Sequence, residues 1–105
     1  MAKSMTTVEE YNAAIAGPGL VVVDFFATWC GPCRGIAPQI EVLAGENPDV
    51  SFIKVDVDNL SDVAESEKIE AMPTFKFFKG GVLKDTVMGA NLEKIKAVLE
   101  KCKAE

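Results

Sequence analysis

Residues 21–34 read VVVDFFATWCGPCR and carry the chain from an apolar run into a pair of cysteines. The run begins at Leu20 and is rich in β-branched residues up to Phe26, which is typical of a strand covered on both faces. Cys30 and Cys33 follow at the predicted start of a helix, where free N–H groups and the helix dipole stabilise a thiolate. Two thiols at this spacing can pass electrons by closing and opening a disulfide. The stretch therefore predicts a central strand of a mostly parallel sheet with a redox pair beside it.

The composition is that of one soluble globular domain, which we expect to span residues 1–105. Hydrophobic residues make up 49% of the chain and charged residues 26%, an ordinary balance for a folded protein. Lys and Arg number 11 against 16 Asp and Glu, so the net charge is -5. This charge disfavours nucleic acid and anionic membranes as partners.

The first residues, Met1–Thr7, lack the apolar core of a secretory signal. Nowhere do about 18 apolar residues run together, as a membrane-spanning helix requires. Three cysteines in so short a chain do not resemble a secreted disulfide framework, which normally has an even number. A cytoplasmic location is therefore expected.

The chain contains no histidine. Cysteine–histidine protease dyads, histidine-ligated zinc and histidine general bases are therefore excluded. Three cysteines also cannot supply a four-thiolate zinc site within one chain. No metal is expected.

Helix signals flank the central strand. Thr7 and Glu10 have the spacing of a capping box and predict a first helix that ends at Gly17–Gly19. After the cysteines, apolar residues at helical spacing predict a second helix that ends near Gly45. Pro38 removes one of its hydrogen bonds, so a kink is expected there.

The middle of the chain repeats the order of strand and helix. Val50–Val57 is a predicted strand, and Asn59 is placed to cap a short helix that continues to about Lys68. Strands that alternate with helices indicate an α/β architecture.

The pattern changes in the last third of the chain. Two strand-like runs, Thr74–Phe78 and Val82–Met88, are joined by Lys79–Gly81, which predicts a hairpin. The sheet is therefore expected to be mixed, with an antiparallel end. Asn91 is placed to cap a last helix with an apolar stripe. The stripe consists of Leu92, Ile95, Leu99 and Cys102.

These features together resemble the thioredoxin family over nearly the whole chain. The resemblance is carried by motifs in family order and spacing: residues 23–34, Ala37-Pro38, residues 54–58, residues 72–75 and Gly89-Ala90. It implies a three-layer α/β/α fold with a mixed five-stranded sheet of order 1-3-2-4-5 and four helices. It also implies a weak first strand around residues 3–5, which the sequence pattern alone does not indicate.

The resemblance implies a protein-disulfide reductase that works in the cytosol and contributes to cell redox homeostasis. No cofactor would be bound, and NADPH would supply electrons indirectly through a thioredoxin reductase. The other partners would be proteins that carry disulfides, such as peroxiredoxin- or reductase-type clients. A monomer is expected.

The two cysteines receive separate roles. Cys30, the first in the motif, is expected to face solvent as the attacking nucleophile, and Cys33, one turn into the helix, to be the more buried resolving thiol. Together they would close a Cys30–Cys33 disulfide. Gly31 permits a close approach of substrate backbone, and Pro32 restricts the first turn of the helix. In related oxidoreductases this dipeptide tunes the redox potential, and Gly-Pro resembles the reducing members.

Asp24 is an acidic residue inside an apolar run. Burial should raise its pKa into a range suited to proton transfer, and the resemblance implies that it helps to deprotonate Cys33. The alternative is a carboxylate at a strand end, paired with a surface cation. Lys54 in the neighbouring strand is expected to pair with Asp24 and modulate its pKa, unless it is an ordinary solvated lysine.

Trp29, Met72, Pro73, Gly89 and Ala90 are the expected substrate-binding residues. Trp29 offers an aromatic face to a docking polypeptide, although a lone tryptophan could equally belong to the core. Base rates predict a trans bond before Pro73, whereas the resemblance implies a cis bond that presents the Met72 backbone to an extended substrate. Gly89 and Ala90 would complete the substrate groove, or simply form a turn before the last helix.

Cys102 lies on an apolar stripe, which favours a packed small side chain over a reactive thiol. Its place near the chain end leaves open a dimer joined through Cys102.

The family pattern is not matched everywhere. Arg34 stands where many bacterial members have lysine, and Met72 stands where isoleucine or threonine is common. Two other functions are compatible with the same fold, a disulfide oxidase or isomerase domain and a protein-binding or chaperone module in which redox activity is incidental.

Overall fold

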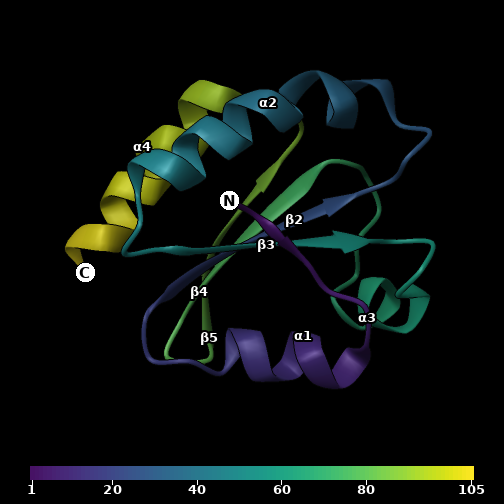
Figure 1. Cartoon of the computed structure of the whole chain (residues 1–105), viewed down its shortest axis with the longest axis horizontal. Helices are drawn as coiled ribbons and strands as arrows, with labels where there is room; N and C mark the ends of the chain where they lie inside the picture. Colours follow the sequence, from purple (N-terminus) through teal and green to yellow (C-terminus); the bar gives the residue numbers. More distant parts are fainter.

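The computed structural model describes residues 1–105 as a sheet between two pairs of helices (Figure 1). α2 and α4 cover one face of the sheet, and α1 and α3 lie against the other. In chain order the elements are β1 (Lys3–Ser4), α1 (Val8–Ile15), β2 (Leu20–Phe26), α2 (Gly31–Glu46), β3 (Ser51–Asp56), α3 (Ser61–Ser66), β4 (Thr74–Lys79), β5 (Val82–Met88) and α4 (Leu92–Ala104).

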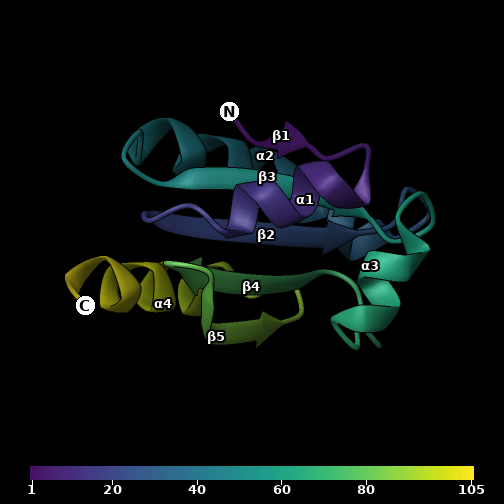
Figure 2. The same cartoon turned by 90° about the horizontal axis from the view of Figure 1, so that it is seen from below.

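The strand order is β1-β3-β2-β4-β5, and Figure 2 shows the strands in this order from top to bottom. β2 pairs in parallel with β3 and antiparallel with β4. The mixed sheet of this order confirms the expected fold. The weak first strand is present as well, because Lys3 and Ser4 pair in parallel with Ile53 and Lys54.

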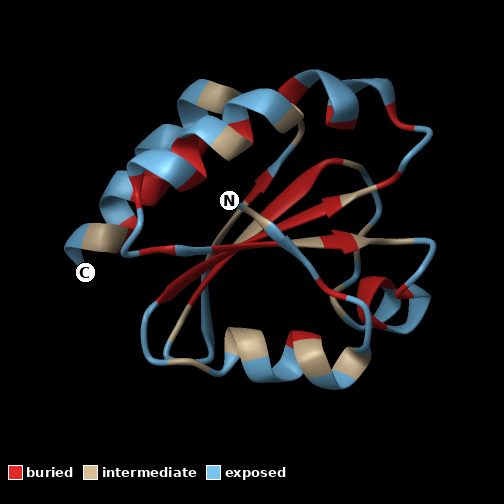
Figure 3. Cartoon of the chain, viewed as in Figure 1, coloured by how far each residue is buried: buried red, intermediate tan, exposed pale blue.

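Burial of β2 on both faces explains its continuous apolar run. Val22 packs into a cluster with residues of α2 and α4, whereas Val23 and Phe25 pack into a second cluster with residues of α1 and α3. Successive side chains point to opposite faces of a strand, so each face of β2 contributes to a different core. Figure 3 shows buried residues along the central strands and on the inner sides of the helices.

Two predicted caps are present. Thr7 Oγ1 accepts the Glu10 N–H at 3.1 Å, and Asn91 Oδ1 accepts the Lys94 N–H at 3.1 Å. In a standard capping box the glutamate side chain would accept the N–H of the N-cap residue, Thr7. Here Glu10 Oε1 accepts the N–H of the preceding residue, Thr6.

The predicted cap of α3 is wrong. α3 begins at Ser61, and Leu60 holds the N-cap position with no side-chain hydrogen bond. The chain turns after β3, where the Leu60 N–H donates to Asp56 O at 2.9 Å. Asn59 lies inside this turn, and α3 ends at Ser66, two residues before the predicted Lys68.

The hairpin between β4 and β5 has a two-residue loop. Lys79 pairs with Val82, and Gly80 and Gly81 both adopt positive φ, at 62° and 79°. Only glycine takes this conformation without steric cost, which explains the Gly-Gly signal.

α2 continues through Pro38 to Glu46, and a kink at this proline stays a prediction. None of the helices has the length and apolar character needed to cross a membrane.

Candidate active site

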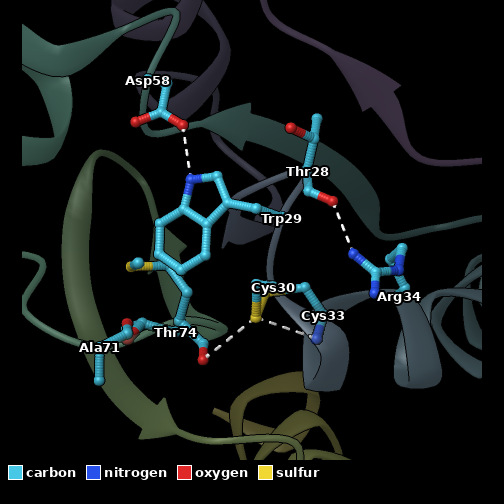
Figure 4. Close-up of a disulfide and its surroundings, with 9 residues drawn as sticks. Thr28, Trp29, Cys30, Cys33, Arg34, Asp58, Ala71 and Thr74 are labelled. Carbon is cyan, nitrogen blue, oxygen red and sulfur yellow. Dashed lines mark hydrogen bonds between the residues drawn. A yellow bond between two sulfur atoms is a disulfide. The ribbon is translucent and has the colours of Figure 1, made fainter.

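The two cysteines of the motif lie where β2 leads into α2. Cys30 is the N-cap residue of α2, Pro32 stands in its first turn, and Cys33 follows on the inner side of the helix. Cys30 and Cys33 form a disulfide, with their Cα atoms 5.3 Å apart. The central strand and the helix start therefore hold the pair in one place (Figure 4).

Cys30 Sγ has two polar neighbours. It accepts the backbone N–H of Cys33 at 3.2 Å, and it lies 3.5 Å from the carbonyl oxygen of Met72. A free N–H at the first turn of a helix stabilises negative charge on the sulfur that caps it. When reduced, this sulfur is well placed to exist as a thiolate.

The expectation that Cys30 faces solvent is wrong for the disulfide form. The residue is 6% exposed, close to the 5% of Cys33. Both cysteines cluster with the fully buried Ala27, and the partly buried Met72 packs against the cluster. The loop before β4 thus covers the disulfide, which the local sequence around the cysteines does not indicate.

The Met72–Pro73 peptide bond is cis, as the resemblance implies and against the base rate for X–Pro bonds. The segment is held on both sides of this bond. Thr74 Oγ1 donates to Ala71 O at 2.6 Å, and the Gly89 N–H donates to Pro73 O at 2.8 Å. Met72, Pro73 and Gly89, predicted from distant parts of the chain, therefore meet beside Cys30.

Trp29 is 65% exposed, so the alternative of a core tryptophan is wrong. Its indole Nε1 donates to Asp58 Oδ2 at 2.9 Å (Figure 4). Trp29 follows β2 and Asp58 follows β3, two parallel neighbours whose carboxyl ends meet at one edge of the sheet. Sequence reasoning missed Asp58, although its place after a predicted parallel strand was the available signal.

Asp24 is 4% exposed. Its side chain lies on the same face of β2 as Val22, the face covered by α2 and α4. Its Oδ1 atom has no hydrogen-bond partner. Burial raises the pKa of Asp24 to about 7, with Lys54 acting in the opposite direction and Glu41 in the same one. The predicted anomaly in the apolar run is therefore a buried carboxyl that titrates near neutral pH.

Lys54 pairs with Asp24 only through the strand register. No ion pair joins the two side chains, so the expected direct pairing is wrong. The Lys54 ammonium instead lies 4.9 Å from the centre of the Phe26 ring, a cation–π contact. Its positive charge still lowers the pKa of Asp24 against the effect of burial.

A cavity of about 220 Å³ connects these groups with Cys33. Asp24, Cys33 and Lys54 all line it, and so does Arg34, whose Nη1 donates to Thr28 O at 2.8 Å (Figure 4). Asp24 and the Cys33 side of the disulfide therefore border one shared space.

The remaining predicted residues surround the start of α2. A Cβ added to Gly31 would meet nothing within 4 Å, so this edge is open. Pro32 and Ala90 line one shallow pocket, and Gly89 has a positive φ of 94°. The turn before α4 thus lies next to the first turn of α2.

Cys102 is fully buried in the cluster under α4. Burial raises the pKa of its thiol, and the Glu105 carboxylate adds to the effect. This placement matches a packed side chain and leaves no exposed sulfur for a disulfide between copies.

No group of three or more Cys, Asp and Glu side chains is placed to hold a metal ion.

Comparison with known proteins agrees with this geometry. The family model described as Thioredoxin matches residues 2–101. The chain belongs to the thioredoxin family. As a thioredoxin with a Cys30–Cys33 disulfide it is a thiol–disulfide oxidoreductase that reduces protein disulfides, and members of this family act with reductases and disulfide substrates.

Three similar proteins illustrate the match. Thioredoxin-2 of Saccharomyces cerevisiae is 49% identical over 94% of this chain and 96% of its own length. A Plasmodium falciparum thioredoxin structure is 47% identical, with a TM-score of 0.92 over 95% of this chain and 98% of that one. A third chain is 35% identical, with a TM-score of 0.91 over 95% of this thioredoxin and 94% of its own length. Its structure concerns thiol resolution in a yeast mitochondrial 1-Cys peroxiredoxin via glutathione/thioredoxin systems.

The buried Asp24 carboxyl predicts a characteristic pH dependence of stability. Its pKa is about 7 in the folded protein and near 3.8 when unfolded. Between these values the folded state keeps the proton that the unfolded state releases, so stability falls as pH rises. Asp24→Asn should abolish this loss, which amounts to about 4 kcal/mol between pH 4 and pH 8.

Urea unfolding of the oxidised protein across this pH range measures the effect. The exposed Asp62 provides the matched control, because Asp62→Asn should retain the wild-type pH dependence. Parallel curves for wild type and Asp24→Asn would contradict the assignment of a raised pKa to Asp24.

Proposed function

We propose that this thioredoxin reduces disulfides of cytoplasmic proteins with electrons that NADPH supplies through a thioredoxin reductase, and so contributes to cell redox homeostasis. The observation that carries the proposal is the Cys30–Cys33 disulfide at the start of α2, with Cys30 Sγ beside both the Cys33 N–H and the Met72 carbonyl. The protein needs no bound cofactor in this scheme.

The reduced protein attacks first through Cys30. Its thiolate, stabilised by the Cys33 N–H, displaces one sulfur of the substrate disulfide. A new bond forms between Cys30 Sγ and the other substrate sulfur, while the substrate S–S bond breaks. The displaced sulfur leaves as a thiolate and takes up a proton.

Cys33 then resolves the mixed disulfide. Its thiol loses a proton to Asp24, a base with a pKa of about 7 on the same cavity. The Cys33 thiolate attacks Cys30 Sγ, the Cys30–Cys33 disulfide forms, and the second substrate sulfur leaves as a thiolate. Two electrons have passed from the dithiol to the substrate, and the proton on Asp24 is available for the leaving thiolate.

The substrate docks on a surface formed by Trp29, Met72, Pro73, Gly89 and Ala90. An extended segment pairs with the Met72 backbone, as in strand addition. The exposed indole of Trp29, oriented by Asp58, packs against the substrate from one side. Ala90 beside Pro32 limits the other side.

The neighbouring residues adjust this chemistry. Gly31 leaves the approach to Cys30 open, and Pro32 fixes the first turn of α2, so the dipeptide tunes the redox potential. The positive charge of Lys54 lowers the pKa of Asp24 and so favours its carboxylate form. The partners are a thioredoxin reductase and disulfide-bearing proteins, including peroxiredoxin-type clients, which the yeast peroxiredoxin structure supports.

A coupled assay tests the reduction and the recycling together. Insulin, NADPH and a thioredoxin reductase should give NADPH oxidation that depends on this protein and disappears in Cys30→Ser. A reaction driven by dithiothreitol serves as the control for substrate reduction alone. If insulin is reduced with dithiothreitol but not with NADPH and reductase, the proposal that a thioredoxin reductase recycles this protein is contradicted.

The order of attack predicts a trapped intermediate. Cys33→Ser removes the resolving thiol, so Cys30 should accumulate covalent mixed disulfides with protein substrates. Non-reducing gels and intact-protein mass spectrometry measure the adducts. Cys30→Ser is the matched control and should form none; adducts in Cys30→Ser but not in Cys33→Ser would reverse the assigned roles.

The docking surface predicts a selective effect on KM. Ala90→Leu adds bulk beside Pro32, where the substrate lies, and should raise KM for insulin by about threefold or more with little change in kcat. Ala97→Leu, on an exposed position of α4, is the matched control. Equal KM values for both variants and wild type would show that Ala90 does not contact the substrate.

A further inference from the structure

A lysine, Lys76, lies in the middle of β4, between Thr74 and Phe78 on the same face of the strand. Phe75 and Phe77 point into the core under α2 and α4, and Phe78 packs into the opposite cluster under α1 and α3. Lys76 alternates with Phe75 and Phe77 and so points to the side of α1 and α3, with its side chain 12% exposed. A charge so far removed from water must be paired and hydrogen-bonded.

The partner of Lys76 is Glu67, the residue that follows α3. Lys76 Nζ donates to the backbone carbonyl of Glu67 at 2.8 Å and lies 3.3 Å from its Oε1 atom. The second carboxylate oxygen, Oε2, accepts the hydroxyl of Tyr11 from α1 at 2.7 Å. Tyr11, Glu67 and Lys76 thus form one network that joins α1, the end of α3 and β4.

This network holds the start of the segment that covers the disulfide. Directly after Glu67, Lys68 adopts a positive φ of 59°, and the Ile69 N–H returns to Ala64 O at 2.9 Å. The chain then runs through Met72 and enters β4 at Thr74. Residues 67–73 therefore begin at Glu67, which is bound to Lys76 of β4. They end where β4 begins, at Thr74, two residues before Lys76.

Other hydrogen bonds hold the segment at both of its ends, and at the Glu67 end the backbone bonds of residues 67–69 reach only α3. Thr74 Oγ1 holds Ala71, and the Gly89 N–H holds Pro73, both at the Met72 end. At the Glu67 end, the side-chain bonds come from Lys76 and Tyr11. Without the network, the Glu67 end would keep the backbone bonds of residues 67–69 to α3 but would lose its ties to α1 and β4. The Met72 carbonyl, 3.5 Å from Cys30 Sγ, would then be held less tightly.

We infer that Glu67 and Lys76, with Tyr11, are positioning residues for substrate docking, because they fix the segment that presents the Met72 backbone beside Cys30. The inference rests on the docking surface proposed above. The network touches neither the cysteines nor Asp24, so it sets where the substrate binds and leaves the thiol chemistry unchanged.

The test compares four variants in insulin reduction, well below their unfolding temperatures. Lys76→Met removes both bonds to Glu67 and should raise KM by about threefold or more while kcat stays within about twofold. Tyr11→Phe removes one bond and should give a smaller rise in KM. Lys84→Met, an exposed position on β5, makes the same change in charge and should match wild type.

A fourth variant separates positioning from general loss of stability. Val98→Ala removes packing from the α2 and α4 cluster and lowers the unfolding temperature without touching residues 67–73, so KM should stay at the wild-type value. Amide exchange gives a second readout. In Lys76→Met, exchange of the Gly89 N–H, which donates to Pro73 O, should accelerate more than that of Phe25 in β2.

The possible failures are distinguishable. If Lys76→Met and Tyr11→Phe lower stability but leave KM unchanged, while Ala90→Leu raises it, the network is only structural and the inference is overturned. If Ala90→Leu also leaves KM unchanged, the docking surface itself is wrong and the inference falls with it. Should Lys76→Met fail to fold, Tyr11→Phe decides by the same criteria.

Discussion

The hydrogen bond from the Cys33 N–H to Cys30 Sγ is the contact on which the site depends. It makes the reactive sulfur the cap of α2, a position that oxygen atoms of Ser, Thr, Asp or Asn normally take. A charged acceptor strengthens such a bond, and a neutral disulfide sulfur weakens it. The start of α2 therefore stabilises the reduced, nucleophilic form of Cys30 more than the oxidised form, and folding and reactivity share one interaction.

That contact requires β2 to deliver Cys30 to a fixed place. Two cores bury opposite faces of β2, so the strand cannot shift its register without exposing one of them. The same double burial explains Asp24. A carboxyl on the strand face covered by α2 loses much of the hydration that stabilises its charge, and its pKa of about 7 is a consequence of the packing that holds the cysteines.

The sequence predicted the parts of the fold that local patterns determine. The apolar run of β2, the Gly-Gly hairpin and the caps at Thr7 and Asn91 depend on residues close to one another, and the structure has them. Asn59 failed as a cap because a turn after β3 brought Leu60 to that position, with its side chain in the core. A tertiary requirement thus overrode a local preference.

The candidate site shows the same limit. Cys30, Cys33 and Asp24 come from one continuous stretch, and chemistry alone singles them out. The short strand β1 and the cis Met72–Pro73 bond followed only from the family resemblance, because neither has a local signal. Neither the local pattern nor the resemblance predicted the burial of Cys30, to which Met72 contributes from 42 residues further along the chain.

Two polar contacts that no local pattern indicates lie beside residues of the proposed docking surface. Asp58 orients Trp29 from the end of β3, and the Tyr11–Glu67–Lys76 network ties down the segment before Met72. Both join residues distant in sequence, and neither touches a sulfur atom. The reactive groups therefore come from one short stretch, whereas the surface around them is assembled from strand ends and loops. Substrate preference can then change through the distant contacts while β2 and α2 keep the redox chemistry constant.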